Sequence, residues 1–467
     1  MGSSGAGIAI VKGDKVVYAK GYGVRKLGDP APVNERTLFA IGSAGKAFTA
    51  AALAALVDEG KIKWDDPVTK HLKGFELSDP YVTREITIRD LLSHRTGFDR
   101  GELLWYGSTL DRNEILRRIR YQKPTYSFRS TFTYNNIMLL AAGQIIPAVT
   151  GKSWDDFIKE RIFTPLGMTA SNTSITAFKG LDNVAMPHAK LGDTVQVTPW
   201  RNVDNIAPAG AINSNVLDLA QWMRMHLGEG AFESKKIISS GAVKEMHKPQ
   251  MIIPYNPQAP GTTLDAHFTS YGFGWFLHDY HGRKVVQHGG AIDGMSALIA
   301  MIPEEKIGVA VLSNLQGNQL PWALMYRVFD AYLGLPPQDY SAKLLAARNT
   351  AEERGKAAAK RMEDERAKGT KPSLPLEQYA GSYKDEMYGE ATVTQEEGKL
   401  VFRYSPAFTG ELEHWHYDTF RVKWPNPTVA QSFVTFTLNA QGKVEEVKVQ
   451  GMADFKRVPA RAAAAVR

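Results

Sequence analysis

The sequence predicts an α+β fold in which an antiparallel sheet is flanked by helices and is followed by a small all-β domain. Short β-rich runs at residues 7–11 and 15–19, separated by Lys-Gly-Asp, predict a hairpin that places the start of the chain in the sheet. Further strand-like runs lie between residues 271 and 313. Beyond residue 372 the pattern changes to short alternating runs, which are typical of a barrel or a sandwich.

Composition narrows the function classes. The chain has 467 residues, of which 43% are apolar and 22% are charged, so it is long enough for two or three domains, or for one large catalytic domain and a small one, with substantial cores. The net charge of +7 comes from scattered Lys and Arg without a basic stripe, and we therefore expect no nucleic-acid partner. The absence of cysteine excludes thiol catalysis, disulfides and cysteine-ligated metal. We expect neither a cofactor nor a metal site.

Neither a membrane span nor a signal peptide is expected in this sequence. The longest apolar run, at residues 50–57, is too short to cross a bilayer. The first seven residues, MGSSGAG, lack the charged and apolar regions of a signal peptide. We interpret them as an expression scar or a trimmed start.

A serine and a lysine stand one helical turn apart in the segment FAIGSAGKAFTAAALAALVDEG. At this spacing Ser43 and Lys46 lie on the same face of a helix, so the amine can reach the hydroxyl and activate it as a nucleophile. The S-x-x-K pattern also occurs by chance at surface helix starts. Here the Ala- and Leu-rich run that follows is apolar almost all round, which predicts a buried helix that ends near Gly60. A lysine that enters a buried helix favours a functional role.

Acyl transfer by such a pair needs a proton shuttle, a polar group that holds the substrate and an oxyanion donor. Tyr134-Asn135-Asn136, which precedes a second apolar helix, and His288-Gly289-Gly290, at the end of a strand, are the candidates. His94 follows a short helix opened by a capping box at Thr87, and we expect it to form a local hydrogen bond.

In this order the motifs S-x-x-K, Y-x-N and H-x-G resemble those of the serine β-lactamase and penicillin-binding-protein superfamily, in particular its class C-like branch. The resemblance covers roughly residues 7–335 and includes the segments WDDPV, TIRDLLSHRTG and YGFGW. The branch contains D-alanyl-D-alanine carboxypeptidases, D-amino-acid peptidases and carboxylesterases. It implies a β-lactamase-like sheet flanked by helices, and a barrel-like domain after it.

The resemblance implies a role for each motif residue. Ser43 would be the acylated nucleophile, Lys46 its proton acceptor or electrostatic partner, and Tyr134 the general base and acid. Asn136 would bind the acyl amide or ester side of the substrate.

The third motif would form the opposite wall of the site. His288, Gly289 and Gly290 would shape the leaving-group side. The oxyanion hole would consist of the backbone N–H groups of Ser43 and Ala291.

The expected function is therefore that of a serine hydrolase that cleaves ester or amide bonds in a small molecule or short peptide through an acyl-enzyme. The alternatives are a β-lactamase or D-alanyl-D-alanine carboxypeptidase, and an inactive homologue that binds or senses ligands. The resemblance implies a periplasmic or secreted location. Two departures are Gly45, where a hydroxyl residue is common, and the lack of a long helix before the first strand.

Three regions are expected along the chain. Residues 1–340 would form the hydrolase domain, residues 341–371 a charged helical linker, and residues 372–467 the small β domain. Residues 99–123 are polar and irregular with several aromatic side chains, a composition that is typical of either a pocket border or a plain surface excursion.

Overall fold

The computed structural model describes residues 4–254 and 266–459 and has two compact units. The first unit comprises the chain up to residue 100 together with residues 123–350, and the second comprises residues 101–122 and the chain from residue 351 onward. The predicted α+β class with a C-terminal barrel is confirmed. In the part of the chain that is described, no helix is both long and apolar enough to span a bilayer.

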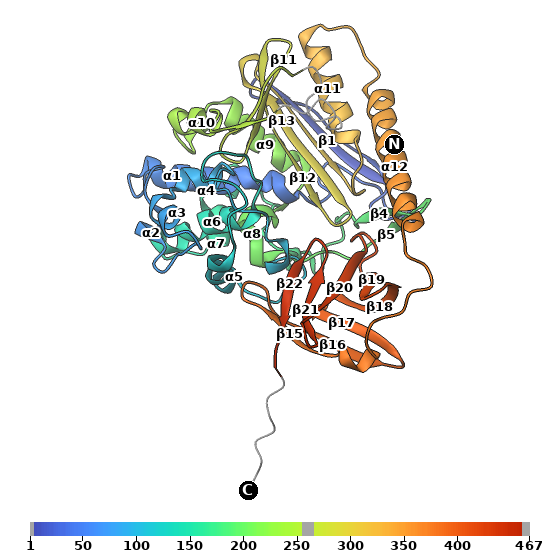
Figure 1. Ribbon diagram of the computed structural model, residues 1–467. Coiled ribbons are helices and arrows are strands. Elements are labelled where there is room, and N and C mark those ends of the chain that lie inside the picture. Colours follow the sequence, from blue (N-terminus) through green and yellow to red (C-terminus); the bar gives the residue numbers. More distant parts are fainter. Residues whose placement is uncertain (1–3, 255–265, 460–467) are drawn as a thin grey trace. The chain divides into compact units, whose positions relative to one another are not determined.

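The first unit is built on an eight-stranded antiparallel sheet (Figure 1). The first strand, β1, pairs with the last strand of the sheet, β14, with Gly7 opposite Leu312, so the first and last strands of this unit are neighbours. The central strands β13 and β14 are buried along their whole length. In spatial order the strands are β2 (Lys15–Gly23), β1 (Gly5–Lys12), β14 (Ile307–Ser313), β13 (Met295–Ile302), β12 (Arg283–Ile292), β11 (Phe276–Tyr280), β10 (Thr269–Tyr271) and β9 (Met251–Ile253).

Two helices cover the face of the sheet beside β1. Helix α11 (Leu320–Leu333) and the first turns of α12 (Tyr340–Asp364) pack in one apolar cluster with Ile8 and Ile10. Tyr340 donates a hydrogen bond of 2.8 Å to the buried carboxylate of Asp330, which fastens the start of α12 to α11. These two helices thus cover the apolar side chains of β1 on this face.

On the other face lies the alanine-rich helix α1 (Lys46–Asp58), which is buried from Lys46 to Leu56 as its all-round apolar sequence predicts. It ends before Gly60, whose φ of +70° gives the left-handed turn that commonly stops a helix. Helix α9 (Val216–Leu227) packs on β1 and β14 beside it. The helix α6 (Asn136–Thr150) packs against α1 in turn.

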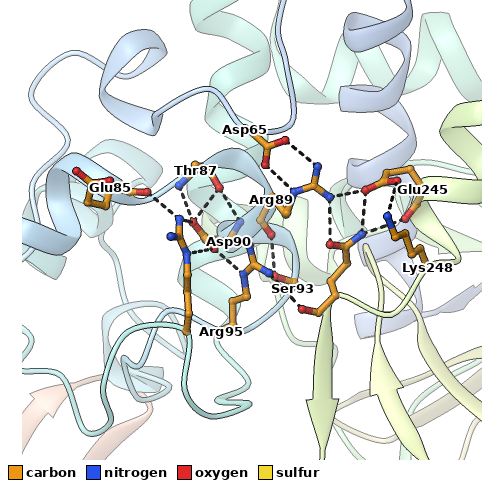
Figure 2. Close-up of polar contacts among 11 residues, drawn as sticks. Asp65, Glu85, Thr87, Arg89, Asp90, Ser93, Arg95, Glu245 and Lys248 are labelled. Atoms are coloured by element: carbon orange, nitrogen blue, oxygen red, sulfur yellow. Dashed lines mark hydrogen bonds and ion pairs between the residues drawn. The ribbon is translucent and has the colours of Figure 1, made fainter.

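A network of ion pairs holds the loops that lead to the helix α6 (Figure 2). Helix α4 (Ile88–Leu92) begins with the predicted capping box between Thr87 and Asp90. The buried Asp90 carboxylate also accepts hydrogen bonds from Arg95 Nε at 2.6 Å and from Arg129 Nη2 at 2.7 Å. Burial alone would raise the pKa of Asp90, but the hydrogen bonds from Arg129 and the charge of Arg95 hold that pKa below its usual value.

Arg89, the residue before Asp90, links helix α4 to the segments that contain Asp65 and Glu245 (Figure 2). It forms a fork of two hydrogen bonds with Asp65, at 2.7 and 2.9 Å, and an ion pair with Glu245. Its guanidinium also lies 5.5 Å from the ring centroid of Phe273, in the YGFGW segment. Helix α4 therefore anchors three loops that are far apart in sequence, those that contain Asp65, Arg129 and Phe273.

In the second unit, eight strands close into a barrel (Figure 1), so the barrel alternative for the C-terminal domain is confirmed and the sandwich is not formed. Alternate residues of each strand fill the interior with aromatic and branched side chains. The strands are β15 (Gly381–Asp385), β16 (Gly389–Glu396), β17 (Lys399–Ser405), β18 (Phe408–His416), β19 (Thr419–Val422), β20 (Ser432–Leu438), β21 (Val444–Val449) and β22 (Ala453–Arg457).

Residues 101–122 belong to this barrel unit, although 250 or more residues separate them from the barrel strands. Leu103 is buried in the barrel's core cluster, and the ring of Tyr106 lies 6.1 Å from that of Phe408. From the short helix α5 (Arg112–Arg118), Arg118 donates a hydrogen bond of 2.9 Å to the carbonyl of Tyr388. The segment is therefore not the plain surface excursion that its composition also allowed.

Limited proteolysis should cut between residues 341 and 371, because α12 exposes most of its side chains beyond Leu344. The two fragments should nevertheless elute together from a sizing column under native conditions, since residues 101–122 of the first fragment pack on the barrel of the second. Leu103→Asp, which buries a charge in that contact, should let the fragments separate. Protection of the whole segment 341–371 would contradict its assignment as a linker.

Asp90→Asn should lower the free energy of unfolding at pH 7 by about 2–3 kcal/mol, because it breaks a buried ion pair whose arginine partners still reach water. The folded-state pKa of Asp90 is lowered, so its contribution is complete above the unfolded pKa of about 3.9 and is lost as pH falls through the folded value. Asp65→Asn is the matched control, because Asp65 is 69% exposed and should cost less than about 1 kcal/mol. Urea unfolding that shows equal losses for the two variants would contradict this account.

Candidate active site

Ser43 lies in a 3-10 turn, η1 (Gly42–Gly45), that runs directly into α1. Lys46 is the first residue of α1, and its Nζ donates hydrogen bonds to Ser43 Oγ at 2.9 Å and to the carbonyl of Ala209 at 2.8 Å. The amine therefore reaches the hydroxyl, as the three-residue spacing predicts. Gly45 is helical, with φ −73°, and a Cβ there would be 3.4 Å from Ile212, so the helix start is intact without the hydroxyl residue.

Tyr134 stands just before α6, at the point where Asn135 caps that helix. The Asn135 side chain accepts hydrogen bonds from the backbone N–H groups of Ile137 and Met138, at 2.8 and 3.2 Å, which fixes the backbone beside Tyr134. Lys46 Nζ lies 4.8 Å from the centroid of the Tyr134 ring. The structure thus brings the first and second motifs together around the lysine.

Like Lys46, Asn136 is a motif residue that is buried beneath the site rather than exposed on its surface. It occupies the first turn of α6 and is 6% exposed. It is not among the residues that line the cleft described below, whereas Ser43, Tyr134 and all three residues of His288-Gly289-Gly290 are.

His94 has a larger part in the site than the local hydrogen bond that the sequence suggested. It is fully buried, and its ring lies 4.2 Å from the ring of Tyr134. Its Nδ1 accepts a hydrogen bond of 3.1 Å from the backbone N–H of Asn135, which is 41 positions away, so Nδ1 carries no proton. Burial and then the charge of Lys46 lower the pKa of His94 well below its usual value. A neutral imidazole therefore supports the ring of Tyr134.

His288, in β12, is also buried and neutral. Its Nδ1 lies 2.6 Å from the carbonyl of Gly289 and so carries the proton, while its Nε2 accepts from the hydroxyl of Tyr271 at 2.9 Å. Burial and then the charge of Lys46 lower the pKa of His288 to about 3. Burial also raises the pKa of Tyr271 well above its usual value, so this hydroxyl keeps its proton and acts as the donor. Sequence reasoning missed Tyr271, which opens the YGFGW segment.

The glycines of the third motif let β12 approach the nucleophile's turn. A Cβ on Gly290 would lie 1.8 Å from the carbonyl oxygen of Ile41, a distance that no side chain can occupy. On the other side, Gly42 has φ +51°, and a Cβ there would be 3.0 Å from the backbone nitrogen of Ala291. The backbone of Ala291 therefore lies directly beside the turn that contains Ser43.

A cleft of about 560 Å³ opens above these residues in the first unit. Ser43, Tyr134 and the third motif form its polar floor, and Phe276 and Trp322 supply apolar walls. Arg100 is the charged side chain among the described residues that line it, and its guanidinium lies 5.1 Å from the Tyr134 ring centroid. Among residues 4–254 and 266–459, no group of three histidine or acidic side chains is placed to hold a metal ion.

Known proteins are similar to this chain over most of its length. The family model described as Beta-lactamase matches residues 1–328, and a domain of unknown function, DUF3471, matches residues 365–460. The unguisins hydrolase ungD' of Aspergillus campestris (strain IBT 28561) is 30% identical over 418 residues, which cover 85% of this chain and 76% of that protein.

Solved structures of penicillin-binding-protein homologues and amidases have a similar fold. The octameric penicillin-binding protein homologue from Pyrococcus abyssi aligns with a TM-score of 0.62 at 24% identity, covering 97% of this chain and 96% of that one. The D-amino acid amidase from Ochrobactrum anthropi SV3 aligns with a TM-score of 0.56 at 23% identity, covering 67% of this chain and 86% of that one. The chain belongs to the Beta-lactamase family of serine hydrolases and penicillin-binding proteins.

Proposed function

We propose that the protein hydrolyses ester or amide bonds through a covalent acyl-enzyme on Ser43. The observation that carries the proposal is the 2.9 Å hydrogen bond between Lys46 Nζ and Ser43 Oγ on the floor of an open cleft. Membership of a hydrolase family supports it, as does the similarity to an unguisins hydrolase across both units. An inactive binding homologue would have no need of this buried lysine beside the serine.

In the proposed mechanism Tyr134 accepts the Ser43 proton during acylation and returns it to the leaving group. Lys46 stabilises the charge that develops on both oxygens, because it contacts Ser43 and lies near the Tyr134 ring. Water then attacks the acyl-enzyme, with Tyr134 again as the base, and releases Ser43. The neutral His94 keeps the Tyr134 ring in place without competing for the proton.

The tetrahedral intermediate needs two hydrogen-bond donors for its oxyanion. We assign them to the backbone N–H groups of Ser43 and Ala291, because the close approach at Gly42 and Gly290 puts the two backbones side by side. The positive end of α1 adds to this field. Only the family resemblance assigns the acyl side of the substrate to Asn136, since this side chain is buried at the start of α6 and does not line the cleft.

Charge on the leaving-group side favours neutral substrates. In related β-lactamases the third motif usually supplies a lysine that holds a carboxylate, whereas His288 here is a neutral imidazole whose pKa is about 3. Esters and small D-amino-acid amides therefore fit this wall better than penicillins do. The second candidate, a β-lactamase or D-alanyl-D-alanine carboxypeptidase, is favoured by one observation, the Arg100 cation at the cleft.

A fluorophosphonate should modify Ser43 and no other residue, because the cleft gives it access to the activated hydroxyl. Intact mass and peptide mapping would locate the adduct, and Ser43→Ala should abolish both labelling and activity. Lys46→Ala and Tyr134→Phe should each lower kcat by about a hundredfold or more while the circular dichroism spectrum stays unchanged. An active enzyme labelled elsewhere would refute the assignment of the nucleophile.

On a panel of p-nitrophenyl esters, D-amino-acid amides and a chromogenic cephalosporin, kcat/KM should be higher for the esters and amides. His288→Lys should shift the ratio toward the cephalosporin by about ten- to hundredfold, the value of one charge-assisted hydrogen bond. His288→Gln, which is neutral, is the control and should leave the ratio near that of the wild type. If the wild type cleaves the cephalosporin faster than a short-chain ester, β-lactamase becomes the leading function.

A further inference from the structure

One wall of the active-site cleft carries side chains that the proposed hydrolysis does not use. Strand β12 contributes Gln287 and Gly289 to it, and the N-terminal end of α11 contributes Gln319 and Trp322. Residues two apart on a strand point to the same face of the sheet, and residues three apart at the start of a helix lie on the same side. We call these four residues the α11 wall.

The strand and the helix meet along this wall. On β13, the residues opposite Gln287 and Gly289 are Ala300 and Leu298, which belong to the apolar cluster that packs on α11. Trp322 packs on the same cluster. A Cβ on Gly289 would lie 3.2 Å from Cζ2 of Trp322, so the glycine leaves room for the indole above the strand. The α11 wall is therefore one continuous surface.

Gln287 is a polar side chain in apolar surroundings. It is 2% exposed, and its Oε1 has no hydrogen-bond partner among residues 4–254 and 266–459. A buried acceptor without a donor is unfavourable, because it has lost its hydrogen bonds to water. Within the same part of the chain, the buried Oε1 of Gln319 also lacks a partner, and its side chain does not cap α11. The α11 wall thus holds two acceptors that need donors.

Neighbouring polar side chains of the cleft are bonded within the protein. His288 uses both ring nitrogens, one with a backbone carbonyl and one with a tyrosine hydroxyl. Ser296 donates to a backbone carbonyl at 2.9 Å. Asn318 donates to a serine hydroxyl at 3.0 Å and accepts from a backbone N–H at 3.1 Å. Internal hydrogen bonds explain these three side chains but not Gln287 or Gln319.

We propose that the α11 wall is a specificity subsite that selects a leaving group with a bulky apolar side chain followed by an amide N–H. The inference rests on the proposed function, in which the third motif borders the leaving-group side. Trp322 offers a large rigid surface to the apolar side chain, and Gln287 Oε1 accepts the N–H. An amino-acid amide or a peptide provides both features, and its repeated N–H groups match two separate acceptors.

Three substrates with the same D-alanyl acyl group and different leaving groups test the subsite on the full-length protein. The leaving groups are phenylalaninamide, in both enantiomers, glycinamide, and phenylalanine dimethylamide, whose carboxamide has no N–H. For the better enantiomer of phenylalaninamide, kcat/KM should exceed that for glycinamide by at least about tenfold, because the apolar contact is added. It should exceed that for the matching dimethylamide by about tenfold, because the buried acceptor of Gln287 is then left unpaired.

Substitutions should separate the two contributions. Gln287→Leu should reduce the preference for phenylalaninamide over the dimethylamide to less than about twofold and keep the preference over glycinamide. Trp322→Ala should have the converse effect. Each ratio compares two substrates on one protein sample, so a loss of folded protein does not alter it. A preference against the dimethylamide that persists in Gln287→Leu would be steric and would overturn the role of Gln287.

Thermal unfolding distinguishes this role from a structural one. Without ligand, Gln287→Leu should be as stable as the wild type or more stable, because it removes an unpaired buried acceptor. A lower melting temperature would mean that Gln287 supports the fold, for example through a buried water, and would overturn the proposal. Gln221→Leu and Trp200→Ala are the matched controls, since neither residue lines the cleft, and both should retain the wild-type substrate ratios.

Binding without turnover separates this inference from the proposed function. In Ser43→Ala, isothermal titration calorimetry should show that phenylalaninamide binds, and that the added Trp322→Ala weakens binding by about tenfold. If none of the amides is hydrolysed, this measurement alone decides, and no binding would overturn the subsite. An acyl adduct on Ser43 with equal kcat/KM for the three substrates would refute the subsite and leave the nucleophile intact. Selective binding without a Ser43 adduct would do the reverse.

Discussion

The contact between Gly290 and the carbonyl of Ile41 is the constraint on which the rest of the site depends. Because no side chain separates them, a sheet strand lies directly against the turn that opens the buried helix α1. Every other part is arranged around this junction of sheet and helix. Ala291 reaches Ser43 only because of it, and Lys46 enters the interior just below it. The left-handed Gly42 completes the fit from the other side.

The charge of the buried Lys46 affects neighbouring titratable groups as well as the atoms to which it donates hydrogen bonds. The charge of Lys46 is, after burial, the largest cause of the lowered pKa values of His94 and His288, which approach the site from different directions. Both histidines are thereby held in the neutral form, each with one defined tautomer set by a backbone group. The site therefore concentrates its proton chemistry on Tyr134, while the two imidazoles have a structural and electrostatic role.

The sequence was most informative where local spacing decides the structure. The three-residue interval of Ser43 and Lys46, the capping box at Thr87 and the apolar run of α1 each depend on neighbours within one or two turns. His94 could not be understood in the same way, because its partner Asn135 and its neighbour Tyr271 are brought to it by tertiary folding. The hydrogen bond from Arg129 to Asp90 also joins residues far apart in sequence, so no local sequence pattern predicts it.

The domain pattern shows a similar limit. The change of composition after residue 372 indicated a small β domain, and short alternating strands are indeed what forms the barrel. Nothing in the polar, irregular segment 101–122 indicated that Leu103 is buried in a core made by the other end of the chain. Such membership depends on shape complementarity between distant segments, which a single sequence does not display.

Because the barrel unit is assembled from two separate stretches of the chain, deleting its C-terminal stretch from the gene would not remove the whole unit. A shortened gene that ended near residue 340 would leave Leu103 and Tyr106 without the core that covers them, and this exposed apolar surface would favour aggregation. A gene for residues 372–467 alone would in turn lack a piece of its own interior. During evolution, the insertion and the appended barrel are therefore expected to have been gained, refined or lost as a pair.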